Sequence, residues 1–166
     1  MKEIKLTKGL VALVDDEDYE YLSKWKWCAA RQHGNRRGIY AVRATYTKLA
    51  GGAKRGLMRM HRQILGENDM KMHVDHVDGN GLNNQRSNLR ICTPSENLRN
   101  RPAAIGNKTG LKGISQDKHG KFVASLKVNG EFIYVGYFTT INEAIPEYNK
   151  ASEKHHGEFG TQHKLI

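Results

Sequence analysis

The chain has 166 residues, of which 38% are hydrophobic and 8% aromatic, so any core is modest in size. Lys and Arg total 27 against 17 Asp and Glu, and the formal net charge of +10 favours a polyanionic partner, because bound cationic side chains release condensed counterions. No apolar run reaches the length of a membrane span, and residues 1–8 lack the apolar core of a secretory signal, so we expect a cytoplasmic protein with no membrane partner.

The first third of the chain is predicted to be rich in β-strands. Residues 5–14 alternate and then become apolar, and the acidic run at residues 15–18 suits the start of a short helix that extends to about Lys24. Residues 25–30 and 39–46 are rich in aromatic and β-favouring residues and are predicted strands.

Two basic segments that contain glycine, residues 31–38 and 51–56, are predicted to be hairpin tips. Both are candidate phosphate contacts. Exposed tips of this composition are more often simply solvated, and the positive charge of the whole chain favours the phosphate role only slightly.

Residues 66–101 are dense in Asn, Asp, His, Gly and Arg, so they are predicted either to stay disordered or to be organised around something such as a metal ion. Asp75 and His76 are adjacent and would point to opposite faces of a strand. Residues 78–81 then form a turn, residues 88–92 a returning strand, and Thr93 or Ser95 caps a short helix that contains Asn97.

These residue types suit the hydrolysis of a phosphodiester bond. A histidine titrates near neutrality and can accept a proton from the attacking water. Carboxylate and amide oxygens suit Mg²⁺, which can hold the phosphate and stabilise the leaving oxygen.

The stretches DHVDGN at residues 75–80 and LNNQRSNLRICTPSEN at residues 82–97 resemble the HNH homing endonucleases of phages and mobile elements, which have a ββα-metal fold. The resemblance implies that His76 is the general base and that Asn88 orients it through a backbone contact across the hairpin. It also implies that Asp75 and Asn97 bind a divalent metal, Mg²⁺ by preference. The source would then be a phage gene expressed in a bacterial host.

Other roles for this segment stay open. His73, Asp75, His76 and Asp78 could form a zinc cluster, but nothing completes a tetrahedral set, and Cys28 and Cys92 form no Cys-x-x-Cys pair. Asn80, Asn83 and Asn84 are assigned only to turns, and His61 has no assigned role. Arg90 is the first choice for contacting DNA near the cut, followed by the phosphate-binding candidates Arg86 and Arg99.

After a linker at residues 102–108, residues 111–116, 121–128 and 131–138 alternate as three strands, with Asn129-Gly130 as a hairpin turn. Residues 142–156 have helical spacing, with Thr140 and Glu143 as a capping box and Pro146 expected to kink or shorten the helix.

This C-terminal part resembles the Apetala/ethylene-response-factor DNA-binding domain, in which one face of a three-stranded sheet enters the major groove. The resemblance implies the following DNA-binding residues: Lys112, Ser115, His119, Lys121, Ser125, Lys127 and Tyr134. Asp117 departs from that family's pattern and would repel phosphate, so the family's recognition sequence does not carry over. Phe122, Val135 and Phe138 are expected to be core.

The predicted fold class is α+β, with a β-rich segment at residues 1–57, a ββα-metal nuclease core at 58–101 and a sheet-plus-helix domain at 109–160. The predicted activity is hydrolysis of double-stranded DNA by a monomer or weak dimer. The rival hypothesis is a DNA-binding regulator with an inactive nuclease core. An RNA-directed nuclease is the third.

Overall fold

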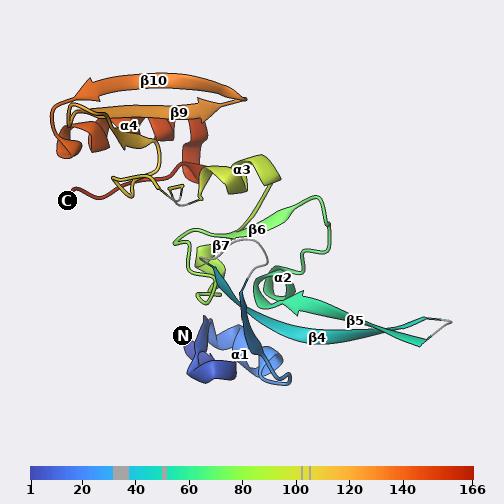
Figure 1. Cartoon of the computed structure of the whole chain (residues 1–166). Coiled ribbons are helices and arrows are strands. Elements are labelled where there is room, and N and C mark those ends of the chain that lie inside the picture. Colours follow the sequence, from blue (N-terminus) through green and yellow to red (C-terminus); the bar gives the residue numbers. More distant parts are fainter. Residues whose placement is uncertain (32–37, 50–51, 102, 105) are drawn as a thin grey trace. The chain divides into compact units, whose positions relative to one another are not determined.

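The computed structural model describes residues 1–31, 38–49, 52–101, 103–104 and 106–166 and has both helices and strands, as predicted (Figure 1). The chain forms two compact units, Met1–Thr93 and Pro94–Ile166, which are described separately. Within the described ranges, no helix is long and apolar enough to cross a membrane.

The first unit begins with a small hairpin. β1 (Lys2–Lys5) pairs antiparallel with β2 (Val11–Val14), and a 3-10 turn at Thr7–Gly9 separates them. The alternating and apolar stretch at residues 5–14 therefore contains the end of β1, the turn and β2, because Lys8 and Gly9 adopt positive φ angles of 66° and 69° and reverse the chain. The predicted helix is confirmed as α1 (Asp16–Leu22).

A three-stranded antiparallel sheet follows in the order β3 (Cys28–Arg31), β4 (Ile39–Leu49) and β5 (Gly52–Arg59). Strands were expected at both β3 and β4. The prediction of a tip at residues 51–56 was wrong for residues 52–56, which pair with residues 45–49 of β4. Most of the other predicted tip, residues 32–37, lies outside the described residues.

The polar stretch of the first unit folds by packing on the core of the residues before it. α2 (Met60–Leu65) precedes β6 (His73–His76), which pairs antiparallel with β7 (Leu89–Cys92) after a 3-10 turn at Arg86–Asn88. Val74 and Leu89 share one buried cluster with Val14, Leu22 and Trp27. Apolar side chains of this polar segment therefore share the core of the residues before it.

The second unit starts with α3 (Pro94–Arg99) and contains an antiparallel sheet packed on one long helix, as predicted. The sheet order is β10 (Glu131–Phe138), β9 (Phe122–Val128) and β8 (Ile114–Gln116). Asn129 and Gly130 both have positive φ, 50° and 95°, which gives the tight hairpin that their sequence predicted.

α4 (Ile141–His156) covers one face of this sheet and ends in a 3-10 turn, Gly157–Phe159. The capping box of Thr140 and Glu143 is confirmed. The prediction that Pro146 shortens the helix was wrong, since α4 continues for ten residues beyond it. Pro146 removes one backbone donor, and burial of Ile145 and Tyr148 on either side offsets that loss.

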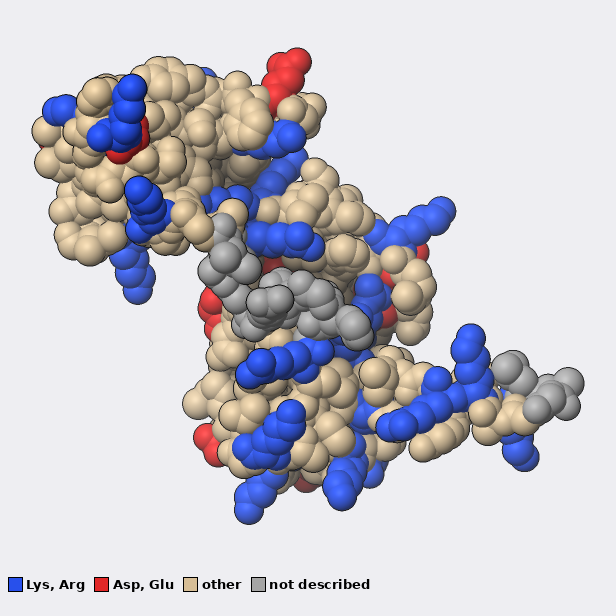
Figure 2. Space-filling view, viewed as in Figure 1, with Lys and Arg blue, Asp and Glu red and all other residues tan. Residues whose placement is uncertain are grey.

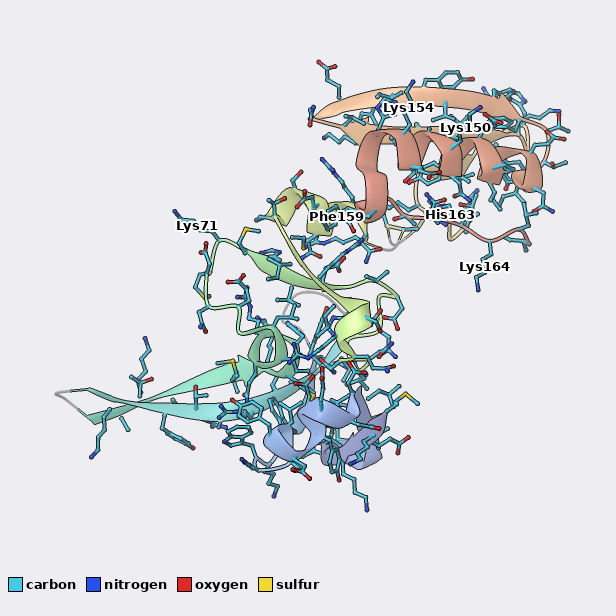
Figure 3. The ribbon with its side chains drawn as sticks, turned by 180° about the vertical axis from the view of Figure 1, so that it is seen from behind. Lys71, Lys150, Lys154, Phe159, His163 and Lys164 are labelled. Carbon is cyan, nitrogen blue, oxygen red and sulfur yellow. The ribbon has the colours of Figure 1, made fainter. Side chains whose placement is uncertain are left out.

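The last residues fold back along α4 (Figure 3). The side-chain amide of Asn149 donates to the carbonyl of His163 and accepts from its N–H, and Asn142 makes the same pair of bonds with Ile166. The His163 ring stacks on Tyr148 with 5.1 Å between ring centroids. These contacts make the segment after residue 160 part of the second unit.

Candidate functional site

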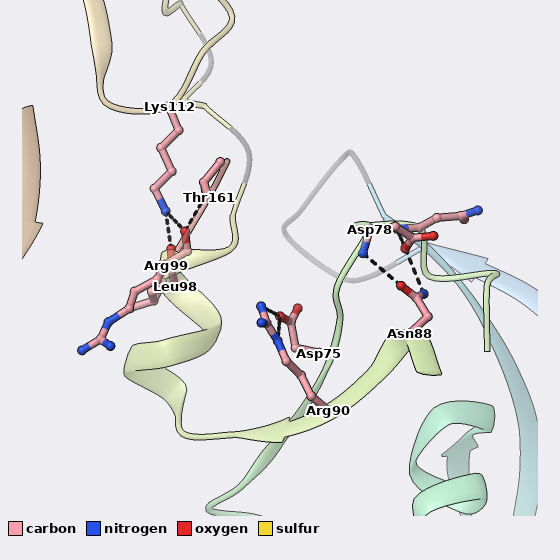
Figure 4. Close-up of polar contacts among 9 residues, drawn as sticks. Asp75, Asp78, Asn88, Arg90, Leu98, Arg99, Lys112 and Thr161 are labelled. Atoms are coloured by element: carbon pink, nitrogen blue, oxygen red, sulfur yellow. Dashed lines mark hydrogen bonds and ion pairs between the residues drawn. The ribbon is translucent and has the colours of Figure 1, made fainter. Parts of the chain in front are cut away.

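The β6–β7 hairpin holds Asp75 and Arg90 opposite each other across its two strands. Nη2 of Arg90 lies 2.9 Å and Nε 3.2 Å from Oδ2 of Asp75 (Figure 4). The side chain of Asp75 is only 11% exposed and that of Arg90 13%, so this ion pair is largely shielded from water. The hairpin therefore presents a carboxylate that a guanidinium already neutralises.

His76, the next residue along β6, contacts a different set of side chains. Its ring is buried and lies edge-on to His61, with 4.9 Å between ring centroids, and Tyr40 lies 5.8 Å away. Nε2 of His76 lies 3.4 Å from Oδ1 of Asn84. Packing on three sides leaves the imidazole little freedom to change rotamer.

Asn84 is fully buried, and a backbone bridge to β2 places it. The N–H of Asn84 donates to the carbonyl of Leu13, and the N–H of Leu13 donates to the carbonyl of Leu82, both at 2.8 Å. Gly81 lets the loop approach β4, because a Cβ atom there would clash with the carbonyl of Ile39 and the ring of Tyr40. Sequence reasoning assigned Asn84 only to a turn and missed its contact with His76, since nothing local distinguishes it from its neighbours.

Asn88 contacts the turn that follows His76. Its Oδ1 accepts from the N–H of Asp78, its Nδ2 donates to Oδ1 of Asp78, both at 3.0 Å, and its carbonyl accepts from the N–H of Val77 (Figure 4). Burial raises the pKa of Asp78, but hydrogen bonds from Asn83, the Asn80 N–H and Asn88 outweigh it and leave that pKa lowered. The turn therefore has a fixed shape and an ionised carboxylate.

Burial keeps both imidazoles of this site neutral. The pKa of His61 is lowered to about 3, first by burial and then by the charges of His76, Arg59 and Arg62. Burial also lowers the pKa of His76, although Asn84, Asp78 and Asp75 act in the opposite direction. A neutral His76 has a lone pair with which to accept a proton.

The predicted catalytic and metal-binding residues are divided between the two units. Asp75, His76 and Asn88 lie in the first unit, and Asn97 lies in α3 of the second. Across the described part of the chain, no three His, Cys, Asp or Glu side chains are grouped closely enough to hold a metal. A metal bound at Asp75 would therefore depend on oxygen ligands beyond these side chains.

Arg86, predicted to bind phosphate, is held by α1. Its guanidinium pairs with Asp18 at 2.8 Å and Glu17 at 3.0 Å, while its backbone N–H donates to Asp15. The hydrogen bonds that Arg86 donates to the carboxylate of Asp18 raise the pKa of Arg86. Arg99, the other predicted phosphate ligand, ends α3, and its carbonyl accepts hydrogen bonds from Lys112 and Thr161.

Four of the predicted DNA-binding residues share the sheet face that α4 does not cover. Ile114, Ala124 and Leu126 point to the core beneath α4, so the alternating positions Ser115, Ser125 and Lys127 point away from it. Tyr134 pairs with Ser125 across the β9–β10 ladder and is 66% exposed. Phe122, Val135 and Phe138 pack against the buried cluster, as expected.

The remaining predicted contacts lie elsewhere in the second unit. Nζ of Lys112 donates to the carbonyls of Leu98 and Arg99 at the end of α3, both at 2.6 Å (Figure 4). Burial lowers the pKa of Lys112 to about 8. Lys121 donates to Thr139, and His119 is exposed in the β8–β9 turn.

Asp117, which departs from the sequence pattern of the Apetala-type family, has a structural role in this chain. One carboxylate oxygen accepts the N–H groups of His119 and Lys121, and the other accepts the hydroxyl of Tyr137 at 2.5 Å. The Tyr137 bond is the largest of the effects that lower the pKa of Asp117. Asp117 therefore shapes the turn between β8 and β9.

Comparisons with known proteins match the part of the chain that contains the β6–β7 hairpin. A family model described as HNH endonuclease matches residues 60–99. A protein of Acanthamoeba polyphaga mimivirus, described as uncharacterized HNH endonuclease L560, is 31% identical over an alignment of 163 residues. The match covers 95% of this chain and 77% of that protein. Protein 3.8 of Escherichia phage T7 is 46% identical over 46 residues, 28% of this chain and 38% of its own length. No solved structure matches. A viral relative aligns with 95% of this chain, and the nuclease family model covers the hairpin that carries His76. The chain therefore belongs to the HNH endonuclease family.

Proposed function

We propose that the chain is a metal-dependent endonuclease that hydrolyses phosphodiester bonds of double-stranded DNA with His76 as general base. The observation that supports this most directly is a neutral, packed imidazole one residue from the Asp75 carboxylate. Nucleases of this family act on phosphodiester bonds, and a histidine held in one orientation and kept unprotonated suits removal of a proton from water.

The neighbours of His76 indicate which ring nitrogen would accept the proton of the attacking water. We propose the tautomer in which Nε2 carries the proton and donates to Oδ1 of Asn84, and in which Nδ1 accepts the proton of the attacking water. His61 and Tyr40 hold the ring plane, and Asn88 holds the backbone just after it. Asn88 then acts as a positioning residue through the turn and not on the substrate.

The Asp75 carboxylate is the proposed protein ligand for a divalent cation, by preference Mg²⁺. Its oxygens are of the donor type that Mg²⁺ prefers, and Mg²⁺ commonly keeps several waters beside one or two carboxylates. Such an ion would supply charge stabilisation at the leaving 3′ oxygen. Arg90 would have to share or release Asp75 for the ion to bind. Asn97 as a second ligand stays a prediction from the family resemblance.

The second unit is proposed to supply affinity for the DNA target. Ser115, Ser125, Lys127 and Tyr134 lie together on the face that α4 leaves uncovered, and a β-sheet face can enter a major groove. This supports, as a proposal, the resemblance to the Apetala-type domain. A homing-type role in a phage-infected bacterium fits the two viral relatives.

Nicking of supercoiled plasmid tests this function. The wild-type chain should nick in Mg²⁺ and stop in EDTA, His76→Ala should bind DNA without cutting, and His155→Ala on α4 should behave as wild type. If His76→Ala still cuts DNA, His76 is not the general base. DNA binding with no cutting by the wild type in any divalent cation would favour the regulator with an inactive core.

A further inference from the structure

The outer parts of β4 and β5, residues 43–49 and 52–58, form a two-stranded ribbon with which no other described strand pairs. β3 pairs only with residues 39–42 of β4, and the ribbon extends beyond that point (Figure 1). Seven residues of strand span about 23 Å at about 3.3 Å per residue. A two-stranded hairpin in water is marginally stable without a surface to pack on, so a ribbon of this length is expected to lie against a partner.

One face of the ribbon has large exposed side chains that contribute to neither core. Tyr46 is 70% and Leu57 68% exposed, and neither is in a buried cluster. Tyr46 pairs with Arg55 and Leu57 with Ala44, so Tyr46 and Leu57 are diagonal neighbours on one face. Lys48 lies two residues beyond Tyr46 on the same face.

The ribbon lies in a stretch of the chain whose charged side chains are all basic. Between Glu20 and Glu67 the chain contains no Asp or Glu but eleven of its 27 Lys and Arg residues. Figure 2 shows Lys and Arg side chains along the ribbon with no acidic side chain among them. Lys48, Lys54 and Arg55 are exposed and form no ion pair with any described residue. Nothing described in the chain neutralises the ribbon, so its partner is expected to be anionic.

We propose that the ribbon lies in a groove of duplex DNA and forms a DNA contact separate from the sheet face of the second unit. The major groove is about 12 Å wide and accepts a two-stranded β-ribbon. Lys48 and Arg55, which share the face of Tyr46 and Leu57, then contact phosphates, while Tyr46 and Leu57 face base edges, where apolar atoms contact thymine methyl groups. Lys54 pairs with Thr47 on the other face and adds positive charge without lying in the groove. This inference rests on the proposed action on DNA.

The test measures binding of a random-sequence duplex by fluorescence anisotropy in EDTA, in a His76→Ala parent that leaves the DNA intact. The ribbon variant adds Lys48→Ala, Lys54→Ala and Arg55→Ala. The matched control removes equal charge from exposed sites outside the ribbon with Lys71→Ala, Lys150→Ala and Lys154→Ala (Figure 3). All six side chains are exposed, so unchanged melting temperatures are expected to confirm folding.

Salt dependence gives the readout, because each phosphate contact contributes about 0.9 to the slope of log affinity against log salt. We expect the ribbon variant to lose about 1.8 from that slope, through Lys48 and Arg55, and the control less than about 1. Tyr46→Ala should weaken binding without changing the slope. Equal losses in both triple variants would show an effect of net charge and overturn the proposal. An equal loss on single-stranded DNA of the same sequence would overturn placement in a groove.

The two proposals fail in different ways. A wild-type chain that neither binds nor nicks DNA removes the proposed nuclease function. If the wild-type chain nicks plasmid and the ribbon variant binds DNA as tightly as its parent, only the proposed DNA contact of the ribbon is overturned. Binding to an acidic protein surface predicts this second outcome.

Discussion

Oδ1 of Asn84 lies 3.4 Å from Nε2 of His76, and Asn84 is fully buried. This relationship predicts that Asn84→Ala lowers kcat for nicking about 10- to 100-fold, the cost typical of losing a partner that orients a site residue. KM for DNA should stay unchanged, because Asn84 is shielded from the substrate. Asn68→Ala, at an exposed loop position, is the control. A rise in KM with constant kcat would contradict a positioning role.

The buried His61 predicts acid sensitivity of the first unit. Its folded pKa of about 3 lies below the unfolded value near 6.5, so the unfolded state binds an extra proton between these values. The free energy of unfolding should be highest above pH 6.5 and fall as the pH drops toward 3. Urea unfolding at several pH values should show a smaller fall in His61→Gln than in the wild type. An equal fall in both would show that another group causes it.

The Asp75–Arg90 pair predicts a link between stability and metal. Removing one partner of a buried ion pair costs about 3–5 kcal/mol, so Arg90→Met should lower the melting temperature in EDTA. Mg²⁺ without DNA should raise the melting temperature of Arg90→Met more than that of the wild type, because the cation takes the place of the guanidinium. Adding Asp75→Asn to the variant should abolish this shift. A shift that survives in the double variant would place the cation elsewhere.

Gly81 predicts a steric effect on the site. Gly81→Ala puts a methyl group against the carbonyl of Ile39 and the ring of Tyr40 and should cost about 1–3 kcal/mol. The shifted loop should also lower kcat by displacing Asn84. Gly79→Ala meets no atom within 4 Å but has φ of 72°, so it should cost only about 1–2 kcal/mol. Chemical denaturation and nicking rates of both variants check the difference.

Two lysines of the second unit are predicted to differ in role. Lys112 caps α3 with both of its donated bonds, so Lys112→Met should lower thermal stability and leave the salt dependence of DNA binding nearly unchanged. Lys127 is exposed beside the Phe132 ring, so Lys127→Met should reduce the salt slope by about 0.9 and leave stability nearly unchanged. The reverse pattern would show that Lys112, and not Lys127, contacts DNA.

Local signals predicted the elements whose geometry is set locally. The Asn129-Gly130 turn and the Thr140–Glu143 capping box depend on residues a few positions apart, and both were predicted from the sequence. The alternating strands of the second unit were found for the same reason. His76 as general base stays a prediction from its residue type and its neighbours in the sequence.

Features that depend on distant contacts were missed. Asn84 acquires its contact with His76 because residues 82–84 bridge to Leu13, about seventy positions away. Arg86 and Lys112 looked like free cations until Asp18 and the end of α3 were placed beside them. The roles of these side chains depend on tertiary contacts, and the periodicity of a sequence does not predict such contacts.

The buried cluster that joins Val14, Leu22 and Trp27 to Val74 and Leu89 has a practical consequence for protein engineering. A fragment trimmed to residues 58–101 would lose β2 and most of the apolar surface on which its hairpin rests. Grafting the proposed cutting activity onto a DNA-targeting protein would therefore call for at least the first 93 residues as donor, not only the short stretch around His76.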